Sequence, residues 1–327
     1  ILSPQGTHVR VRGIHAQNEE AGSGVVGQRC AVNITGGQLN KADIHRGGWL
    51  LEKEVHAPVP RFDARIRVLS SEARSLEHWT PVHVHLGAAE VPGRVAILGE
   101  KSIEPGKTGL IQIVLDRRIG ALRDDGFILR DQSAQRTIAG GRILDPFSPA
   151  RGRAKSERID FLHAMELDKA DHALAQLLAQ LPLGLDLSHF ITAWNLTEEE
   201  QNTIFDSVKM IKVVKGNSTI GLSPGHFNTI GSIILDILQK WHVEHPDKPG
   251  PGINEMRSSI TVRIPLAVFK GVLESLIGEK KIIHLGANYC LPGFESKFSG
   301  EDDALWKRIL PLLESGYMQP PVVHALS

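Results

Sequence analysis

The feature that most constrains the fold of this 327-residue chain is a change in the spacing of its apolar residues near Pro146. Before that point, apolar residues recur at every second position, as in Val82-His83-Val84-His85-Leu86, which is typical of half-buried strands. After it, leucines from Leu174 to Leu181 follow the i, i+3, i+4, i+7 spacing of an amphipathic helix. The stretch 145–155 has no period and is rich in Pro, Gly and basic residues, which indicates a linker. The chain therefore predicts antiparallel β-modules first and helical modules afterwards.

The β part itself divides into two stretches, residues 1–52 and 53–147. In the first, we expect every second residue from Cys30 to Ile34 to face a core, while Arg29 lies on the opposite side of the strand. In the second, short strands recur at roughly regular spacing with turn residues between them, which is typical of a small barrel or sandwich. Two β-modules in series are therefore expected before the linker.

The helical part repeats one order of elements, namely helix, short helix, helix and hairpin, over residues 148–224 and again over 225–297. Three helices that end in a hairpin form the winged-helix plan, a variant of the helix-turn-helix. The beginning of a third copy is expected over residues 298–327. The sequence therefore predicts tandem winged helices.

Polar residues indicate where two helices of the first copy begin. Ser188 is the expected N-cap of the short helix, because its hydroxyl can accept a hydrogen bond from a free backbone N–H. Thr197 and Glu200 have the spacing of a capping box, so the next helix is expected to begin directly after Thr197.

Composition limits the classes of function. The chain has 37 basic and 37 acidic residues, so any RNA-binding surface must be local, because a protein that grips RNA over a large area shows a basic surplus. Cys30 and Cys290 have no metal-type spacing and fit a reducing cytosol. No apolar run reaches about 18 residues, so no membrane segment is expected. The chain opens on Ile1 in mid-pattern, which favours a fragment of a longer protein.

Two short stretches imitate the motifs of a GTPase. Asn40-Lys41-Ala42-Asp43 has the form of a guanine-reading tetrapeptide, and Gly106-Lys107-Thr108 has the form of the end of a phosphate loop. A phosphate loop needs a Gly five positions before its second Gly, so that backbone N–H groups can wrap the phosphates, and Lys101 stands there. We therefore interpret both stretches as turns between strands.

No constellation of catalytic or metal-binding residues stands out in the sequence. His83 and His85 lie two apart on one face of a predicted strand, but no third ligand follows at metal-type spacing. No Ser/His/Asp or Cys/His pattern is evident. We expect neither a metal site nor a catalytic residue in this chain.

The strands before the linker resemble those of a known family. The stretches VGQRCAVNI at 26–34 and IHRGGWLL at 44–51 resemble the second half of the β-barrel that follows the GTPase domain in translation elongation factors. Residues 82–95 and 127–141 are similar to the next barrel of such factors, and elongation factor Tu shares the second pattern. Together with the tandem winged helices, these stretches look most like the bacterial selenocysteine-specific elongation factors.

The resemblance implies elongation-factor-type antiparallel β-barrels followed by tandem winged-helix domains. Residues 1–52 would be the C-terminal part of the domain 2 barrel, and residues 53–147 a domain 3-like barrel. Residues 148–224 and 225–297 would be winged helices, and 298–327 the start of a truncated third one. The GTPase domain and the C-terminal winged helices that bind messenger RNA would be missing from this chain.

The resemblance also implies a function. A factor of this family delivers selenocysteyl-tRNA to the ribosome at recoded UGA codons and is tethered to a messenger RNA hairpin through its C-terminal domains. The parent protein is expected to be a cytoplasmic GTPase that uses GTP and Mg, with no membrane partner. The fragment itself is expected to hold no cofactor.

Arg29 is the residue that the resemblance places in the aminoacyl pocket. A selenol is more acidic than a thiol and carries negative charge at neutral pH. A guanidinium, which is always charged, would favour that anion over the neutral hydroxyl of serine. Arg130 and Arg136 are the implied contacts to the tRNA backbone in the T-stem, whereas the pattern alone is equally that of surface charge.

Lysines flank the hairpins of both predicted winged helices. Lys212 and Lys215 flank the first hairpin, and Lys280 and Lys281 the second. They are candidate RNA contacts, although lysines also protect exposed strand edges from pairing. We interpret 148–297 as spacer modules between the barrels and the missing RNA-binding domains.

Two other functions are compatible with parts of the pattern. A winged-helix DNA-binding regulator with a β-barrel sensor would need a basic recognition helix, but the helix after Thr197 begins with Glu198-Glu199-Glu200 and contains Asp206, which DNA phosphates would repel. A general translational GTPase relative with unrelated appended helices would show no preference for selenocysteyl-tRNA over seryl-tRNA.

Overall fold

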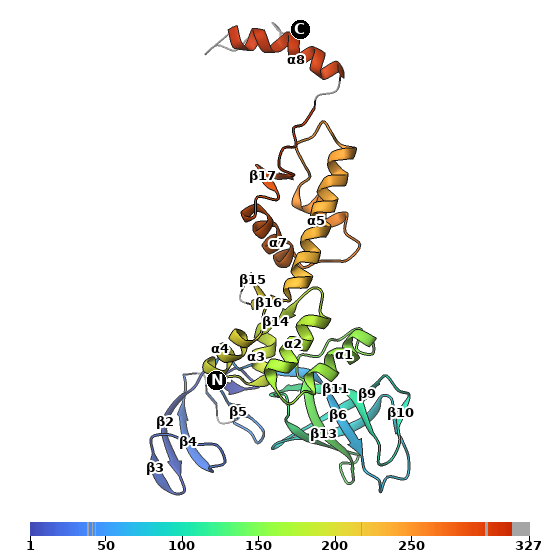
Figure 1. Ribbon diagram of the computed structural model, residues 1–327. Helices are drawn as coiled ribbons and strands as arrows, with labels where there is room; N and C mark the ends of the chain where they lie inside the picture. The colour runs from blue at the N-terminus through green and yellow to red at the C-terminus, as the bar shows by residue number, and fades with distance from the viewer. Residues whose placement is uncertain (38, 41, 43, 217, 298–299, 316–327) are drawn as a thin grey trace. The chain divides into compact units, whose positions relative to one another are not determined.

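The computed structural model traces most of the chain in two compact units (Figure 1). The residues that it describes are 1–37, 39–40, 42, 44–216, 218–297 and 300–315. The first unit comprises Ile1–Gln180 and Asp186–Lys209, and the second Leu181–Leu185 and Met210–Ser327. Of the stretch at 40–43, Lys41 and Asp43 lie outside the described residues.

The first unit begins with a small open sheet whose strand order is β3-β2-β4. Its strands are β2 (Arg10–Ala16), β3 (Glu19–Ala21) and β4 (Cys30–Thr35). The two-residue strands β1 (Leu2–Ser3) and β5 (Trp49–Leu50) pair with each other and bring the two ends of this stretch together.

The expectation that alternate residues of β4 face a core is wrong in this structure. Val32 remains 41 % exposed, as does Val11 on the neighbouring strand, and Cys30 is only half-buried. The physical reason is that three short strands have too little surface to enclose a core unless a second layer covers them.

The next module is a closed six-stranded antiparallel barrel, with the strand order β11-β6-β13-β12-β8-β9. Its strands are β6 (Val59–Val68), β8 (Thr80–Leu86), β9 (Ala89–Leu98), β11 (Thr108–Ile119), β12 (Gly126–Arg130) and β13 (Thr137–Asp145). A short pair, β7 (Leu76–Glu77) with β10 (Ser102–Ile103), accompanies it. Closure leaves the barrel strands without free edges.

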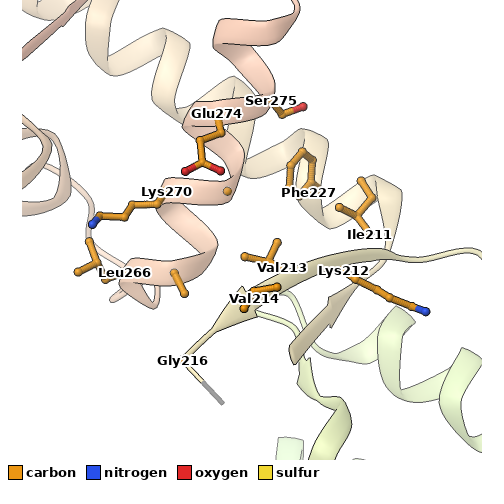
Figure 2. A pocket seen from close by; sticks show the side chains of 12 residues that line it. Ile211, Lys212, Val213, Val214, Gly216, Phe227, Leu266, Lys270, Glu274 and Ser275 are labelled. Carbon is orange, nitrogen blue, oxygen red and sulfur yellow. The ribbon is translucent and has the colours of Figure 1, made fainter. Parts of the chain in front are cut away.

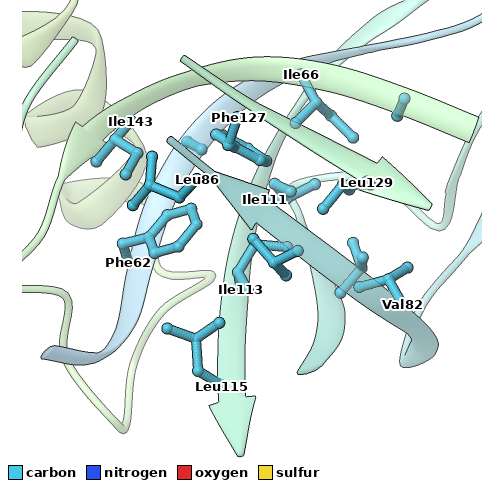
Figure 3. Close-up of a cluster of buried hydrophobic side chains, with 14 of the residues drawn as sticks. Phe62, Ile66, Val82, Leu86, Ile111, Ile113, Leu115, Phe127, Leu129 and Ile143 are labelled. Carbon is cyan, nitrogen blue, oxygen red and sulfur yellow. The ribbon is translucent and has the colours of Figure 1, made fainter. Parts of the chain in front are cut away.

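Alternation along the strands fills the barrel interior with apolar side chains (Figure 3). Ile111, Ile113 and Leu129 have no exposed surface, and the rings of Phe62 and Phe127 meet edge to face with centroids 5.1 Å apart. Each such side chain contributes about 1.5–3 kcal/mol by its burial. The predicted barrel is confirmed.

The stretch Gly106-Lys107-Thr108, which has the form of the end of a phosphate loop, leads into β11. Lys107 N–H donates to the Glu104 carbonyl over 3.0 Å, and Gly106 has a φ of 78°, which favours glycine. Thr108 is the first residue of β11. The interpretation of Gly106-Lys107-Thr108 as a turn that leads into a strand is therefore confirmed.

Four helices complete the first unit: α1 (Ser156–Met165), α2 (Ala170–Gln180), α3 (Leu187–Trp194) and α4 (Glu198–Ser207). The capping box of Thr197 and Glu200 is confirmed, with both reciprocal hydrogen bonds present. The expected cap at Ser188 is wrong, because the Asp186 carboxylate accepts from the N–H groups of Ser188 and His189. The Asp186 carboxylate, two residues before Ser188, accepts from the free backbone N–H groups at the helix start, so Asp186 and not Ser188 is the N-cap.

The second unit has the winged-helix order. Its elements are β15 (Ile211–Lys215), β16 (Ser218–Leu222), α5 (Pro224–Glu244), α6 (Ile253–Ser258), α7 (Leu266–Gly278), β17 (Ile283–Leu285), β18 (Asn288–Cys290) and α8 (Gly300–Ser315). Strand β14 (Leu185–Asp186) pairs with β16 in the sheet β14-β16-β15. The predicted succession of barrel and winged-helix elements is confirmed.

The core of the second unit joins its helices to the hairpin β15–β16. Ile234 of α5 and Phe269 of α7 are fully buried, and Val213 and Leu222 of the hairpin pack in the same cluster. The hairpin expected to end the first winged helix thus shares the core of α5 and α7. Of the expected third copy, 298–299 and 316–327 lie outside the described residues, and a third winged helix stays a prediction.

Among the residues that the structure describes, no helix has both the length and the apolar character needed to cross a membrane.

Candidate functional site

Arg29 follows a tight turn that leads into β4. Gln28 closes this turn twice: its backbone N–H donates to the Val25 carbonyl over 3.1 Å, and its side-chain oxygen accepts from the Val25 N–H over 2.9 Å. Gly27 adopts a φ of 86°, a conformation that glycine tolerates without strain. The turn therefore fixes the backbone directly before Arg29.

The side chain of Arg29 is exposed, as the alternation predicts for a residue off the core. Within the described part of the chain, no hydrogen bond or ion pair engages its guanidinium. Five N–H donors in a rigid planar fork are thus available to an anion. Val25 and Val26 of the same turn are also exposed, so apolar surface borders this charge.

Arg130 and Arg136 lie at the loop between β12 and β13. Arg136 forms ion pairs with Glu72 at 3.0 Å and Asp131 at 3.9 Å, while Arg130 is half-buried and donates to the Gln135 carbonyl over 3.2 Å. Donation from the Arg136 backbone N–H holds the pKa of Asp131 below its ordinary value. The structure brings both arginines together at one loop, but the charge of Arg136 is already balanced by carboxylates.

The wing lysines do not converge. Lys281 pairs with Glu279 over 2.7 Å, and both side chains are about half exposed. Lys280 is exposed and has a φ of 57°. Lys212 is exposed on β15, and the side chain of Lys215 lies outside the described part of the structure.

A groove of about 810 Å³ separates the strand of Lys212 from α7. Figure 2 shows that Lys212 extends away from the groove, whereas Lys270 and Glu274 of α7 lie along it. The apolar side chains of Val214 and Leu266 border the same groove. This mixture of charges and the divergence of the two lysines do not make a phosphate pocket.

A buried ionic network fixes α1 to the barrel. The Arg158 guanidinium donates to Asp63 over 2.6 and 2.8 Å and to Asp145 over 2.6 Å, and Asp63 has no exposed surface. The Gln112 amide donates to the second Asp63 oxygen over 2.8 Å. Burial outweighs the attraction of Arg158 and raises the pKa of Asp63 to about 6. Its near-complete burial and its internally satisfied charges make this network structural rather than ligand-binding.

A cleft of about 500 Å³ on the outside of the barrel was not foreseen from the sequence. Four arginines line it, Arg65, Arg67, Arg123 and Arg142, together with three carboxylates, Asp124, Glu166 and Asp168. The alternation of Arg65-Ile66-Arg67 places two of them on one strand face, and that signal is visible in the sequence. The contribution of Arg142 depends on strand register, which local patterns do not reveal.

His83 of β8 has a carboxylate neighbour on β9. His83 Nδ1 lies 3.0 Å from a Glu90 carboxylate oxygen across the β8–β9 pair. In the described ranges, no group of three or more His, Cys, Asp or Glu side chains has the arrangement to hold a metal ion.

Comparison with known proteins assigns both modules. Residues 63–150 match the family model of the selenocysteine-specific elongation factor β-barrel domain, and residues 235–287 match the elongation factor SelB winged helix. Over 310 residues the chain is 30 % identical to the selenocysteine-specific elongation factor of Escherichia coli (strain K12), covering 93 % of this chain and 47 % of that protein. The factor of Haemophilus influenzae is 28 % identical over 316 residues, covering 95 % and 48 %.

A crystal structure of a bacterial selenocysteine-specific elongation factor, EF-Sec, has the same fold. It superposes with a TM-score of 0.65 at 16 % identity, covering 97 % of this chain and 47 % of that one. The closed antiparallel barrel and the winged-helix elements after it thus share the fold of that structure.

The chain matches selenocysteine-specific elongation factors in its barrel, in its second winged helix and along nearly its whole length, and these matches support a factor of that kind, as the resemblance implied. It spans about half the length of the curated relatives that it matches. A DNA-binding regulator is not favoured by these matches.

Proposed function

We propose that this chain is part of a protein that delivers selenocysteyl-tRNA to the ribosome at recoded UGA codons. The observation that carries the proposal is the match of both modules, in the same order, to selenocysteine-specific elongation factors. GTP with Mg would bind in a domain outside these residues, as would the messenger RNA hairpin. Such a protein acts in the cytoplasm.

The proposal gives each module a task. The strands of 1–52 carry part of the aminoacyl pocket, and 53–147 form the barrel that holds the tRNA backbone near Arg130 and Arg136. The modules 148–224 and 225–297 are spacers that connect the barrels to RNA-binding domains. The exposed lysines of their wings add weak contacts to RNA.

Arg29 selects the aminoacyl group in this proposal. Its support is the preformed turn, the exposed guanidinium, and the absence of a partner for it among the described residues. A selenolate would receive charge-assisted hydrogen bonds from the guanidinium, whereas the neutral hydroxyl of a seryl group would receive weaker ones. This preference matters because the same tRNA first carries serine.

The test of the function uses the full-length protein with GTP. We expect it to bind selenocysteyl-tRNA far more tightly than seryl-tRNA in a filter-binding titration. Equal affinity for the two would contradict the proposal and favour a general translational GTPase relative.

A second titration tests where GTP binds. The chain of residues 1–327 alone is expected to show no saturable binding of the fluorescent analogue mant-GTP. Saturable binding at micromolar concentration would refute the placement of the nucleotide site in another domain.

A further inference from the structure

The arginine cleft lies on the outer face of the barrel. Along β6, Ala64, Ile66 and Val68 point into the core, so Arg65 and Arg67 point outward. The register of β13 against β6 places Arg142 directly opposite Arg65, and Gly140 opposite Arg67. Two neighbouring strands thus bring three guanidinium groups to one patch.

Like charges directly opposite each other on a sheet are unfavourable, so such a patch needs compensation. Glu166 compensates the charge of Arg65, because its carboxylate accepts two hydrogen bonds of 2.6 and 2.7 Å from the guanidinium in a bidentate pair. The more distant Arg123 is held by the carbonyls of Met165 and Leu167, at 2.8 Å each. Both arginines therefore have fixed structural roles in holding the end of α1.

Arg67 and Arg142 are held differently. Arg67 is exposed and has no acceptor for its guanidinium among the described residues. Arg142 pairs with Asp124 over 2.7 Å, but the two side chains are 68 % and 55 % exposed. Exposed pairs of this kind contribute little to stability, so an anion can replace Asp124 at low cost.

The floor between these two arginines is bare backbone. Gly140, opposite Arg67, has no side chain to cover it, and Thr108 of β11 flanks Arg67 on the other side. Guanidinium forks match phosphate oxygens in a bidentate geometry. Arg67 and Arg142 are diagonal neighbours on adjacent strands, so one anionic strand can reach both forks.

We propose that this cleft binds the phosphate backbone of RNA through Arg67 and Arg142. It is a contact additional to the loop of Arg130 and Arg136 and does not depend on the aminoacyl group. The chain thereby gains an RNA contact at the place where the C-terminal end of α1 packs on the barrel. Two phosphates make it an auxiliary site of modest affinity.

The experiment titrates a fluorescein-labelled 16-base-pair RNA duplex of arbitrary sequence with residues 1–327, at several salt concentrations. For the double variant Arg67→Gln/Arg142→Gln, we expect several-fold weaker binding and a salt slope smaller by about 1–2. Arg94→Gln is the matched control, because Arg94 is also an exposed barrel arginine but does not line the cleft.

For a second variant we expect the opposite change in RNA affinity. Asp124→Asn releases Arg142 and is expected to tighten RNA binding several-fold, and Asn tolerates the φ of 68° at this position. A merely structural role of the arginines would not produce this gain. Thermal unfolding midpoints check that all variants fold.

Three outcomes would overturn the proposal. The double variant could match the parent chain in affinity and salt slope, or Arg94→Gln could lose as much. A decamer of glutamate could bind with the same dependence on Arg67 and Arg142 while RNA does not, which would identify an acidic peptide as the ligand. Loss of selenocysteyl preference in the full-length protein would leave this result untouched, so the two proposals fail separately.

Discussion

The closed barrel and the three-stranded sheet before it carry the same alternating pattern, yet they bury very different amounts of it. Leu129 in the barrel has no exposed surface, whereas Val32 in the sheet is 41 % exposed. Alternation determines which side chains share a face, but closure determines whether water reaches that face. The region with little core of its own also carries Arg29, so in our proposal recognition and stability are served by different modules.

The largest effect is expected where the barrel holds α1. Arg158→Met leaves Asp63 and Asp145 facing each other without a cation, and removing one partner of a buried pair costs about 3–5 kcal/mol. Urea unfolding followed by circular dichroism measures this loss. Arg94→Met, on the barrel surface, serves as the control and is expected to change the free energy of unfolding by less than about 0.5 kcal/mol. Similar values for both variants would show that the network does not stabilise the fold.

Core truncation tests the comparison itself. Leu129→Ala removes a fully buried side chain and is expected to cost about 2–5 kcal/mol. Val32→Ala removes a half-exposed one and is expected to cost less than about 1 kcal/mol. Chemical denaturation of both variants gives the two values. Equal costs would mean that the sheet is covered as well as the barrel is.

The titration of Asp63 is the next effect in size. Because burial raises its pKa from 3.8 to about 6, the folded protein binds this proton more tightly than the unfolded chain does. The free energy of unfolding should therefore fall as pH rises from about 4 to about 6, by about 1–3 kcal/mol. Denaturation curves across this pH range measure the slope, and Asp63→Asn should reduce it. An unchanged slope in Asp63→Asn would assign it to other groups.

Much of the fold follows from local patterns. The period-two stretches predict the strands of the barrel, since Ile111, Ile113 and Leu115 recur at every second position and all three lie in the barrel core. The capping box of Thr197 and Glu200 predicts where α4 begins. These features depend on residues that are neighbours in sequence, and they can therefore be predicted from the sequence.

Other features depend on partners that are distant in sequence. Asp63 and Arg158 lie 95 positions apart, and Arg65 and Arg142 meet only through the register of β6 and β13. The alternation of β4 predicts a buried face, but the sequence does not say whether a second layer covers it. The proposed role of Arg29 can be inferred from the family resemblance alone, because an exposed arginine next to a strand is otherwise common.

The smallest effect on stability and the largest on recognition are expected at Arg29. Arg29→Ala removes an exposed side chain, so the free energy of unfolding should change by less than about 0.5 kcal/mol. Arg29→Lys keeps the charge but loses the planar fork, and is expected to fall between the parent and the alanine variant in tRNA selection.

The most direct measurement compares the affinities of full-length parent and Arg29→Ala proteins for selenocysteyl-tRNA and seryl-tRNA in the presence of GTP. We predict that Arg29→Ala weakens selenocysteyl-tRNA binding far more than seryl-tRNA binding, because only the selenolate uses the guanidinium charge. Equal losses for the two tRNAs would contradict the account.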